Sequence, residues 1–231
     1  IYLKILMNEI ASIDKISRTY SQGGKKIEVL HRLSLKVKKG ETVAILGQSG
    51  SGKSTFLSLL AGLDKPDFGS IEINGTELTK LNQEDLAHFR SKNLGIVFQQ
   101  YHLMSNLTAL ENVSLPLELQ RQKEAEPKAR KALEQVGLSH RLSHLPSELS
   151  GGECQRVALA RAMVSKPSLI LADEPSGNLD GKTGQEVMKL LFKLCREHEQ
   201  TLILVTHNHE LSRLCDRCLE LRNGKLHAPK E

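Results

Sequence analysis

Residues 42–54 decide the fold of this chain: Thr42-Val43-Ala44-Ile45-Leu46 runs directly into Gly47-Gln48-Ser49-Gly50-Ser51-Gly52-Lys53-Ser54. The first five residues form a continuous apolar run, which is typical of a buried strand in a parallel sheet. The next eight match the phosphate-loop pattern GxxxxGK[ST], and helical spacing of apolar residues follows them as far as residue 61. A strand, a glycine-rich turn and a helix in this order predict a phosphate-binding site at the turn.

The residue types in this turn suit that chemistry. Glycines let backbone N–H groups turn inward around phosphate oxygens, and the N-terminus of the following helix adds partial positive charge. We predict that Lys53 reaches the β- and γ-phosphates of a nucleotide and that the Ser54 hydroxyl ligates Mg²⁺. The alternative is a glycine-rich loop that matches the pattern by chance, and the flanking strand and helix argue against it.

A second acidic element supports a nucleotide site. Leu169-Ile170-Leu171-Ala172 is an apolar run that ends in Asp173 and Glu174. In open α/β sheets, ligands bind at the carboxyl ends of the strands, so Asp173 is placed to join the Mg²⁺ shell. Glu174 can polarise a water in line with the γ-phosphate. A solvated strand end is the alternative, and the phosphate loop favours the functional interpretation.

Strand and helix signals alternate along the chain, which predicts a mostly parallel sheet with helices on both faces. Strands are expected at 33–37, 42–46, 69–73, 95–98, 169–172 and 201–205, with a final hairpin at 218–226 around Asn223-Gly224. Helices are expected at 52–61, 82–90, within 108–136, through 157–164 and around 187–194. The polar helical stretch predicts a helical subdomain inserted at about residues 100–165. We expect one composite domain over residues 8–228.

Leu149-Ser150-Gly151-Gly152-Glu153-Cys154-Gln155 opens a helix 23 residues before Asp173. On physical grounds this is a second anion-binding helix N-terminus, with a serine hydroxyl and two glycines. A Leu-Ser-Gly-Gly-Glu stretch at this distance resembles the signature motif of ABC-type ATPases. Cys154 departs from the glutamine usual there, at a position that does not contact phosphate.

The resemblance to ABC-type ATPases covers nearly the whole chain. Gln99 resembles the Q-loop glutamine of that family, Gly177-Asn178-Leu179-Asp180 its D-loop, and His207 its switch histidine. Tyr20 stands where an aromatic side chain stacks on adenine. The resemblance implies a RecA-like P-loop NTPase core, an N-terminal antiparallel β-subdomain and an ATP-sandwich homodimer.

The same resemblance implies specific roles. Catalytic roles fall to Lys53, Gln99, Glu174 and His207, and Mg²⁺ ligation to Ser54, Gln99 and Asp173. Nucleotide contacts fall to Tyr20, Gly47, Gln48, Ser49, Gly50, Ser51, Gly52, Lys53, Ser54, Thr55, Ser150, Gly151, Gly152 and Asp180. Ser150 and Gly152 would complete the site of a partner subunit.

Within the family, the chain is most similar to the lipoprotein-releasing and macrolide-exporter (LolD/MacB) branch. The similarity rests on Gln99-Gln100, the stretch 107–113 and Gly177–Asp180. The stretch 215–219 is similar to one bacterial member of that branch. The branch implies ATP hydrolysis that drives export or membrane extraction through a separate permease of the MacB/FtsX-like type, with the chain on the cytoplasmic face of the membrane. An ABC-type scaffold in a division-type membrane complex is the alternative.

Residues 100–107 have no regular hydrophobic period, so they either pack under the helical insert or dock a partner helix.

Composition excludes several classes of protein. With 39% hydrophobic and 26% charged residues and a net charge of +5, the chain is neither disordered nor collagen-like. No apolar run approaches the roughly 18 residues of a membrane span. Residues 1–40 carry nine Lys/Arg against three Asp/Glu; we interpret this bias as a solvated face and expect no nucleic acid partner. We interpret residues 1–7 as an N-terminal extension, and Cys215 and Cys218 as structural cysteines.

Overall fold

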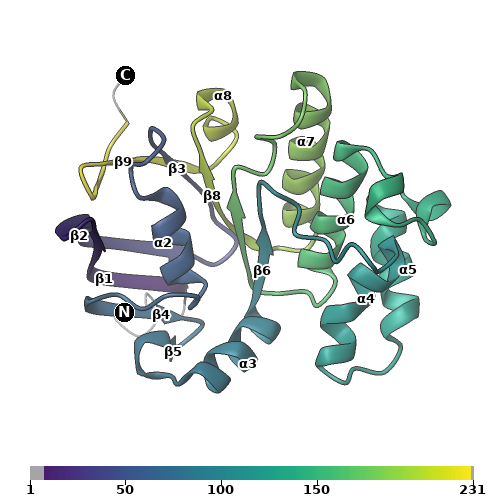
Figure 1. Cartoon of the computed structure of the whole chain (residues 1–231), viewed down its shortest axis with the longest axis horizontal. Helices are drawn as coiled ribbons and strands as arrows, with labels where there is room; N and C mark the ends of the chain where they lie inside the picture. Colours follow the sequence, from purple (N-terminus) through teal and green to yellow (C-terminus); the bar gives the residue numbers. More distant parts are fainter. Residues whose placement is uncertain (1–7, 230–231) are drawn as a thin grey trace.

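The computed structural model describes residues 8–229, so the expectation for residues 1–7 lies outside it. Two sheets organise the chain (Figure 1). The four-stranded antiparallel sheet has the order β2-β1-β4-β5, with β1 at Glu9–Gln22, β2 at Lys25–Lys38, β4 at Phe68–Ile73 and β5 at Thr76–Glu77. The six-stranded sheet has the order β10-β9-β3-β8-β7-β6, with β3 at Thr42–Leu46, β6 at Leu94–Val97, β7 at Leu169–Asp173, β8 at Thr201–Thr206, β9 at Arg217–Arg222 and β10 at Lys225–His227.

The helices lie on both faces of the six-stranded sheet, as the alternation of signals predicts. They are α2 at Lys53–Leu60, α3 at Gln83–Asn93, α4 at Ala109–Leu119, α5 at Ala125–Gln135, α6 at Gly151–Met163, α7 at Gly181–Glu197 and α8 at His209–Ser212. Three short 3₁₀ turns add η1 at Leu78–Lys80, η2 at Ser139–Arg141 and η3 at Pro146–Glu148. Figure 1 shows α2 between the two sheets, whereas α4, α5 and α6 gather on the far side of β6.

Parallel pairing in the central sheet brings the functional strand ends to one edge. Strand β8 lies between β3 and β7, with Leu46 opposite Thr206 and Asp173 opposite Val205. All five residues of β3 and all six of β8 are buried, because helices cover both faces. The carboxyl ends of β3, β7 and β8 therefore meet at the same edge of the sheet.

The apolar core divides by strand periodicity into two clusters. Val43, Ile45 and Val205 face α2 and the antiparallel sheet. Leu204 and Ile170 face α6 and α7 on the opposite side. Alternate side chains of one strand point to opposite faces, so continuously apolar strands hold both layers to one sheet.

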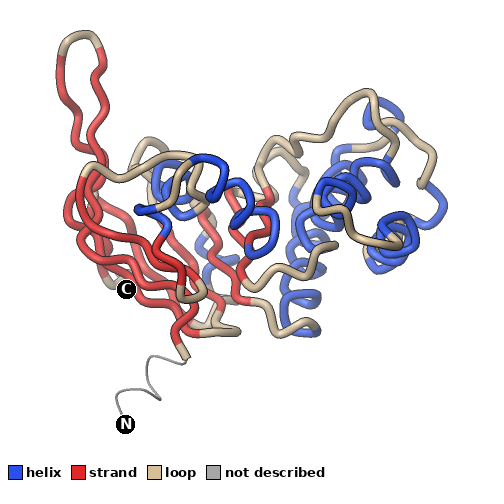
Figure 2. The backbone as a smooth tube through the Cα atoms, turned by 90° about the horizontal axis from the view of Figure 1, so that it is seen from below, coloured by secondary structure: helices blue, strands red, loops and turns tan. Residues whose placement is uncertain are grey.

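The N-terminal hairpin is longer than the sequence pattern predicts. Only residues 33–37 alternate clearly, yet β2 runs from Lys25 to Lys38 and pairs with β1 along its whole length. Register shifts and a positive φ of 47° at Lys15 interrupt the alternation of β1, which hides it from a periodicity argument. Figure 2 shows the end of this hairpin as a projecting ribbon.

Local capping signals correctly predict several helix boundaries. The Asn82 side chain caps α3 by accepting from the Asp85 N–H, and Gly137 follows α5 with a φ of +74°. The 108–136 stretch divides into α4 and α5 at Gln120, and positive φ values at Arg121 and Glu124 mark the turn between them. Among residues 8–229, no helix is long and apolar enough to cross a membrane.

Candidate nucleotide-binding and catalytic site

The phosphate loop follows β3 and includes the first two residues of α2, Lys53 and Ser54. Gly52 has a φ of +101°, and a Cβ on it would lie 2.9 Å from Val29 Cγ1. A Cβ on Gly47 would lie 2.5 Å from Ser51 Oγ and 2.8 Å from the Leu221 carbonyl oxygen. Glycine is therefore required at both positions, for the left-handed backbone at one and for close packing at the other.

Lys53 is buried under this loop, and its side chain is only 7% exposed. Its Nζ donates to the carbonyl oxygens of Gly47 at 2.8 Å and Gln48 at 3.0 Å. The Glu174 Oε1 atom lies 3.5 Å away. A buried ammonium needs such partners, and these contacts hold the amine at the mouth of the loop where a phosphate can replace them.

The Ser51 hydroxyl is a buried polar group within the phosphate loop. Within the described residues, its Oγ is buried and has no hydrogen-bond partner. A buried polar atom without a partner costs free energy, and an oxygen atom of a bound ligand can accept a hydrogen bond from this hydroxyl. Phosphate oxygens are acceptors of this kind.

Asp173 stands at the end of β7 beside the start of α2. Burial raises the pKa of its carboxyl, whereas the neighbouring Ser54 hydroxyl and the Lys53 ammonium lower it. Ser54 and Asp173 together offer a hydroxyl and a carboxylate, and Gln99 lines the same cavity with an amide. These oxygen donors fit Mg²⁺, which binds proteins through one or two carboxylates and completes its shell with phosphates and waters.

Glu174 and His207 form a pair at the ends of two neighbouring strands. His207 Nδ1 lies 2.7 Å from Glu174 Oε2, and the Glu174 side chain is 17% exposed. Glu174 also has a φ of +44°, while its N–H donates to the Val205 carbonyl at 2.9 Å. A glutamate in the left-handed region is strained, and such strain concentrates where a side chain must be aimed at a ligand.

Gln99 is braced by Asn178 from the loop after β7. Its Nε2 donates to Asn178 Oδ1 at 3.1 Å, and Asn178 Nδ2 donates back to the Gln99 carbonyl at 3.1 Å. A Cβ on Gly177 would lie 2.8 Å from Gln99 Nε2, so a larger residue there would displace the Gln99 amide from this position. The reciprocal bonds couple the end of β6 to the loop that leads into α7.

Most of the predicted residues line one cavity of about 740 Å³. The lining consists of Val29, Gln48, Ser49, Gly50, Gly52, Lys53, Ser54, Thr55, Gln99, Asp173, Glu174 and His207. Small-molecule pockets typically enclose about 300–1,000 Å³, and this cavity falls in that range. The structure thus gathers, at one edge of the sheet, a cationic amine, a helix N-terminus, a magnesium-type donor pair and a carboxylate–imidazole pair.

Other predicted residues lie outside this cavity. Ser150 caps α6, where its hydroxyl accepts from the Glu153 N–H at 3.2 Å, and Gly151 packs beside the Tyr101 hydroxyl. Gly152 is buried against Thr183 of α7. Asp180 caps α7 and lines a neighbouring cavity of about 380 Å³ that also touches Glu174 and His207.

Tyr20 lies on β1 and does not line the phosphate-loop cavity. Its hydroxyl donates to Asp64 Oδ2 at 2.7 Å, and the Arg18 guanidinium lies 4.7 Å from its ring centroid. Arg18 bridges Asp64 and Asp67 with two contacts of 2.8 Å. The ring is thus oriented by its own neighbours, and 36% of the residue is exposed for a further contact.

Sequence reasoning missed Val29, and it did not assign Asn178 a role of its own. Val29 comes from β2 and reaches the loop only because the β1–β2 hairpin packs over it. Asn178 lies 79 residues from Gln99, so no local spacing signal links the pair.

The cysteines are not paired in the described part of the chain, and burial raises the pKa of Cys215 to about 12. The same part contains no cluster of three metal-ligating side chains.

The fold and the site together define a P-loop nucleoside triphosphatase. Comparison with known proteins sharpens this class: the family model described as ABC transporter matches residues 30–177. The chain belongs to the ABC transporter family of ATP-binding cassettes and is an ATPase of that family.

Individual relatives resemble the chain over nearly its whole length. The uncharacterized ABC transporter ATP-binding protein YbbA of Escherichia coli (strain K12), the branch member that the 215–219 stretch resembles, is 48% identical over 219 residues, which cover 94% of this chain and 96% of YbbA. The lipoprotein-releasing system ATP-binding protein LolD of Coxiella burnetii (strain RSA 493 / Nine Mile phase I) is 47% identical over 221 residues, covering 94% and 95%. The predicted resemblance to this branch is confirmed.

Solved structures confirm the predicted fold class. The dimeric, post-hydrolysis structure of the ATP-binding cassette MJ0796 bound to ADP and Pi superimposes with a TM-score of 0.88 at 38% identity and covers 96% of this chain and 98% of that chain. CbiO1 from Clostridium perfringens, part of the transporter complex cbiONQ, gives 0.84 at 29% identity, with coverage of 95% and 87%.

Proposed function

We propose that this chain hydrolyses ATP as a homodimer that sandwiches two nucleotides and drives a separate membrane permease. The observation that carries this proposal is the position of Ser150. Its helix N-terminus is a second anion-binding element, yet it does not line the phosphate-loop cavity of its own chain. Figure 1 places α2 and α6 on opposite sides of the central strands, so one nucleotide cannot use both from a single chain.

A two-fold arrangement of two copies resolves this separation. In such a dimer the same surface serves both partners, so each α6 N-terminus faces the phosphate loop of the other copy. The relative MJ0796 forms a dimer in a post-hydrolysis state with bound ADP and Pi, which supports the same arrangement here.

The hydrolytic step assigns one task to each polar side chain. Lys53 exchanges its loop carbonyls for the β- and γ-phosphate oxygens and offsets their charge. Glu174 accepts a proton from the attacking water, and His207 holds the carboxylate through the 2.7 Å contact. Gln99 positions that water while Asn178 fixes the amide. Most of the rate enhancement then comes from positioning and charge neutralisation.

Mg²⁺ completes the proposed site. Ser54 and Asp173 would hold the ion, with Gln99 beside them, because these are the oxygen donors that meet at the end of β7. When bound, the ion neutralises charge on the β- and γ-phosphate oxygens.

The proposal is tested by trapping the dimer. Glu174→Gln should keep ATP binding and lower phosphate release about 10²–10³-fold, since it removes the base and keeps the shape. With ATP, the variant should run as a dimer in light scattering. Adding Ser150→Arg should return it to a monomer, because the larger side chain occupies the space for the partner's γ-phosphate.

The matched control for the dimer is Ser139→Arg, which adds the same side chain at an exposed serine of η2. This control should leave the ATP-dependent dimer intact. A monomer under all conditions, or a dimer indifferent to position 150, contradicts the sandwich arrangement. Unchanged turnover in Glu174→Gln removes that residue from the role of base.

The permease, the direction of transport and the location of the chain complete the proposal. LolD is by name part of a lipoprotein-releasing system, which favours export or membrane extraction and a permease of the MacB/FtsX-like type. The chain would sit on the cytoplasmic face, attached through that permease. Residues 100–107 supply a surface for it: Leu103 packs partly against the core, whereas Met104 is 49% exposed.

A further inference from the structure

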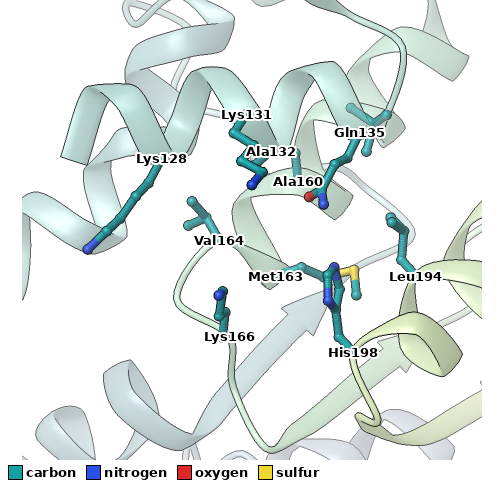
Figure 3. Close-up of a pocket in the computed structure, with 11 residues that line it drawn as sticks. Lys128, Lys131, Ala132, Gln135, Ala160, Met163, Val164, Lys166, Leu194 and His198 are labelled. Carbon is teal, nitrogen blue, oxygen red and sulfur yellow. The ribbon is translucent and has the colours of Figure 1, made fainter. Parts of the chain in front are cut away.

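A second cavity, of about 280 Å³, lies apart from the nucleotide site. It is enclosed by α5, the C-terminal end of α6 with the segment after it, and the C-terminal end of α7 (Figure 3). None of its lining residues also lines the phosphate-loop cavity. The ATPase chemistry therefore leaves this space without a role.

The floor of this cavity is apolar. Ala132 comes from α5 and Val136 directly follows that helix, whereas Ala160 and Met163 come from α6 and Leu194 from α7. All five residues are buried, so the floor is part of the core surface and not a mobile loop. Such a floor favours an aliphatic group that fills it over the ordered water that would otherwise cover it.

The rim of the cavity is basic. Lys128, Lys131, Lys166 and His198 stand around it, and none of the described residues that line it is acidic. Figure 3 shows the Lys131 side chain reaching from α5, and that of Lys166 from the segment after α6, toward the same space. Lys128 points away from that space and donates to Gln122 Oε1 at 3.1 Å. Lys131 and Lys166 are therefore the two cations that face a ligand.

Lys166 has a backbone conformation that is unfavourable for a residue other than glycine. Its φ is +52°, in the left-handed region where glycine is the usual residue after a helix. Its N–H donates to the Met163 carbonyl at 2.9 Å, so the turn itself needs no lysine side chain. The Lys166 side chain lines the cavity and adds a positive charge to its rim.

We propose that this cavity binds a small anionic amphiphile, whose head group lies between Lys131 and Lys166 and whose aliphatic chain covers the floor. Two cations on a rim whose described lining residues include no acidic side chain favour a carboxylate or phosphate head. The cavity holds roughly nine water-sized groups, which matches a carboxylate with a chain of about eight carbons. Octanoate and octyl phosphate are the probes that fit.

Binding is measured by titrating the purified chain with octanoate, and separately with octyl phosphate, in a calorimeter. We expect one saturable site per chain. Lys131→Gln and Lys166→Gly should each weaken binding about tenfold, the loss expected for one charge-assisted contact. Lys166→Gly should fold at least as stably as the wild type, because glycine suits a φ of +52°. Loss of binding in that variant therefore cannot come from unfolding.

Lys189→Gln is the matched control, since it removes the same charge from α7 at an exposed position outside the cavity. It should bind octanoate like the wild type. Octylammonium keeps the aliphatic chain but lacks the anionic head group, and acetate keeps the carboxylate but lacks the chain. Neither should bind with an affinity comparable to that of octanoate.

Vesicles of phosphatidylglycerol distinguish the two sources of such a ligand. Cosedimentation that Lys131→Gln abolishes identifies a bilayer lipid, whereas octanoate binding without cosedimentation identifies a free amphiphile; both support the site. No binding of either probe overturns the proposal, as does equal binding by octylammonium, equal binding by acetate, or indifference to both lysine substitutions.

Discussion

Glu153 offers a test of how the α6 N-terminus is held in place. Its Oε2 accepts from the Ser150 N–H at 2.8 Å, and its Oε1 lies 3.0 Å from Arg141 Nε. These contacts, led by the Ser150 N–H, lower the pKa of the carboxyl from 4.5 to about 2, and the side chain is only 14% exposed. Neutralising this one group should therefore loosen the helix that carries Ser150.

The size and the sign of the effect of Glu153 on the free energy of unfolding follow from proton linkage. The folded pKa is depressed, so the ionised carboxylate stabilises the fold above pH 4.5, and this contribution is lost as the pH falls toward 2. The two pKa values correspond to about 3 kcal/mol of unfolding free energy at pH 7 and about 2 kcal/mol at pH 3.5. A glutamine can still accept from the Ser150 N–H, so Glu153→Gln should be less stable than the wild type by at most about these amounts, and the difference should narrow in acid.

The assay is urea unfolding followed by far-ultraviolet circular dichroism at pH 7 and at pH 3.5. Glu111→Gln is the matched control, because Glu111 closes the same type of capping box on α4 but is exposed and has no arginine partner. Its effect should be clearly smaller. A gap between wild type and Glu153→Gln that is absent at pH 7, or that does not narrow at pH 3.5, refutes the reasoning.

Three further substitutions test the surroundings of the site. Gly52→Ala should destabilise the fold by about 1–3 kcal/mol and weaken ATP binding, because its Cβ would meet Val29 at a φ of +101°; normal binding and melting would contradict the required geometry. Asn112→Leu should cost about 2–3 kcal/mol in urea unfolding, because the buried amide bonds the backbone of Met104, Leu107 and Thr108; a neutral effect would mean that water replaces those bonds. Met104→Glu should leave melting temperature and basal ATPase unchanged and abolish co-purification with the permease, and retained co-purification would place the contact elsewhere.

The local sequence was sufficient to predict those features whose structure depends only on residues close together in the chain. The phosphate loop, the apolar strand ending in Asp173 and Glu174, and the caps at Asn82 and Ser150 are all specified within a few residues. Each depends on backbone freedom, strand burial or a helix terminus, which are properties of neighbours in sequence. The hairpin turn at residues 223–224 belongs to the same class.

Contacts between distant residues were decided only by the tertiary structure. Glu174 meets His207 across 33 residues, and Gln99 meets Asn178 across 79. Both pairings depend on the strand order, which places β8 between β3 and β7 and β6 beside β7. The cavity of about 280 Å³ likewise exists only because α5, α6 and α7 pack together. The periodicity of a sequence predicts on which face of a helix or strand a side chain lies. The residue that it contacts across that face depends on how the elements pack, and the sequence pattern alone does not determine this packing.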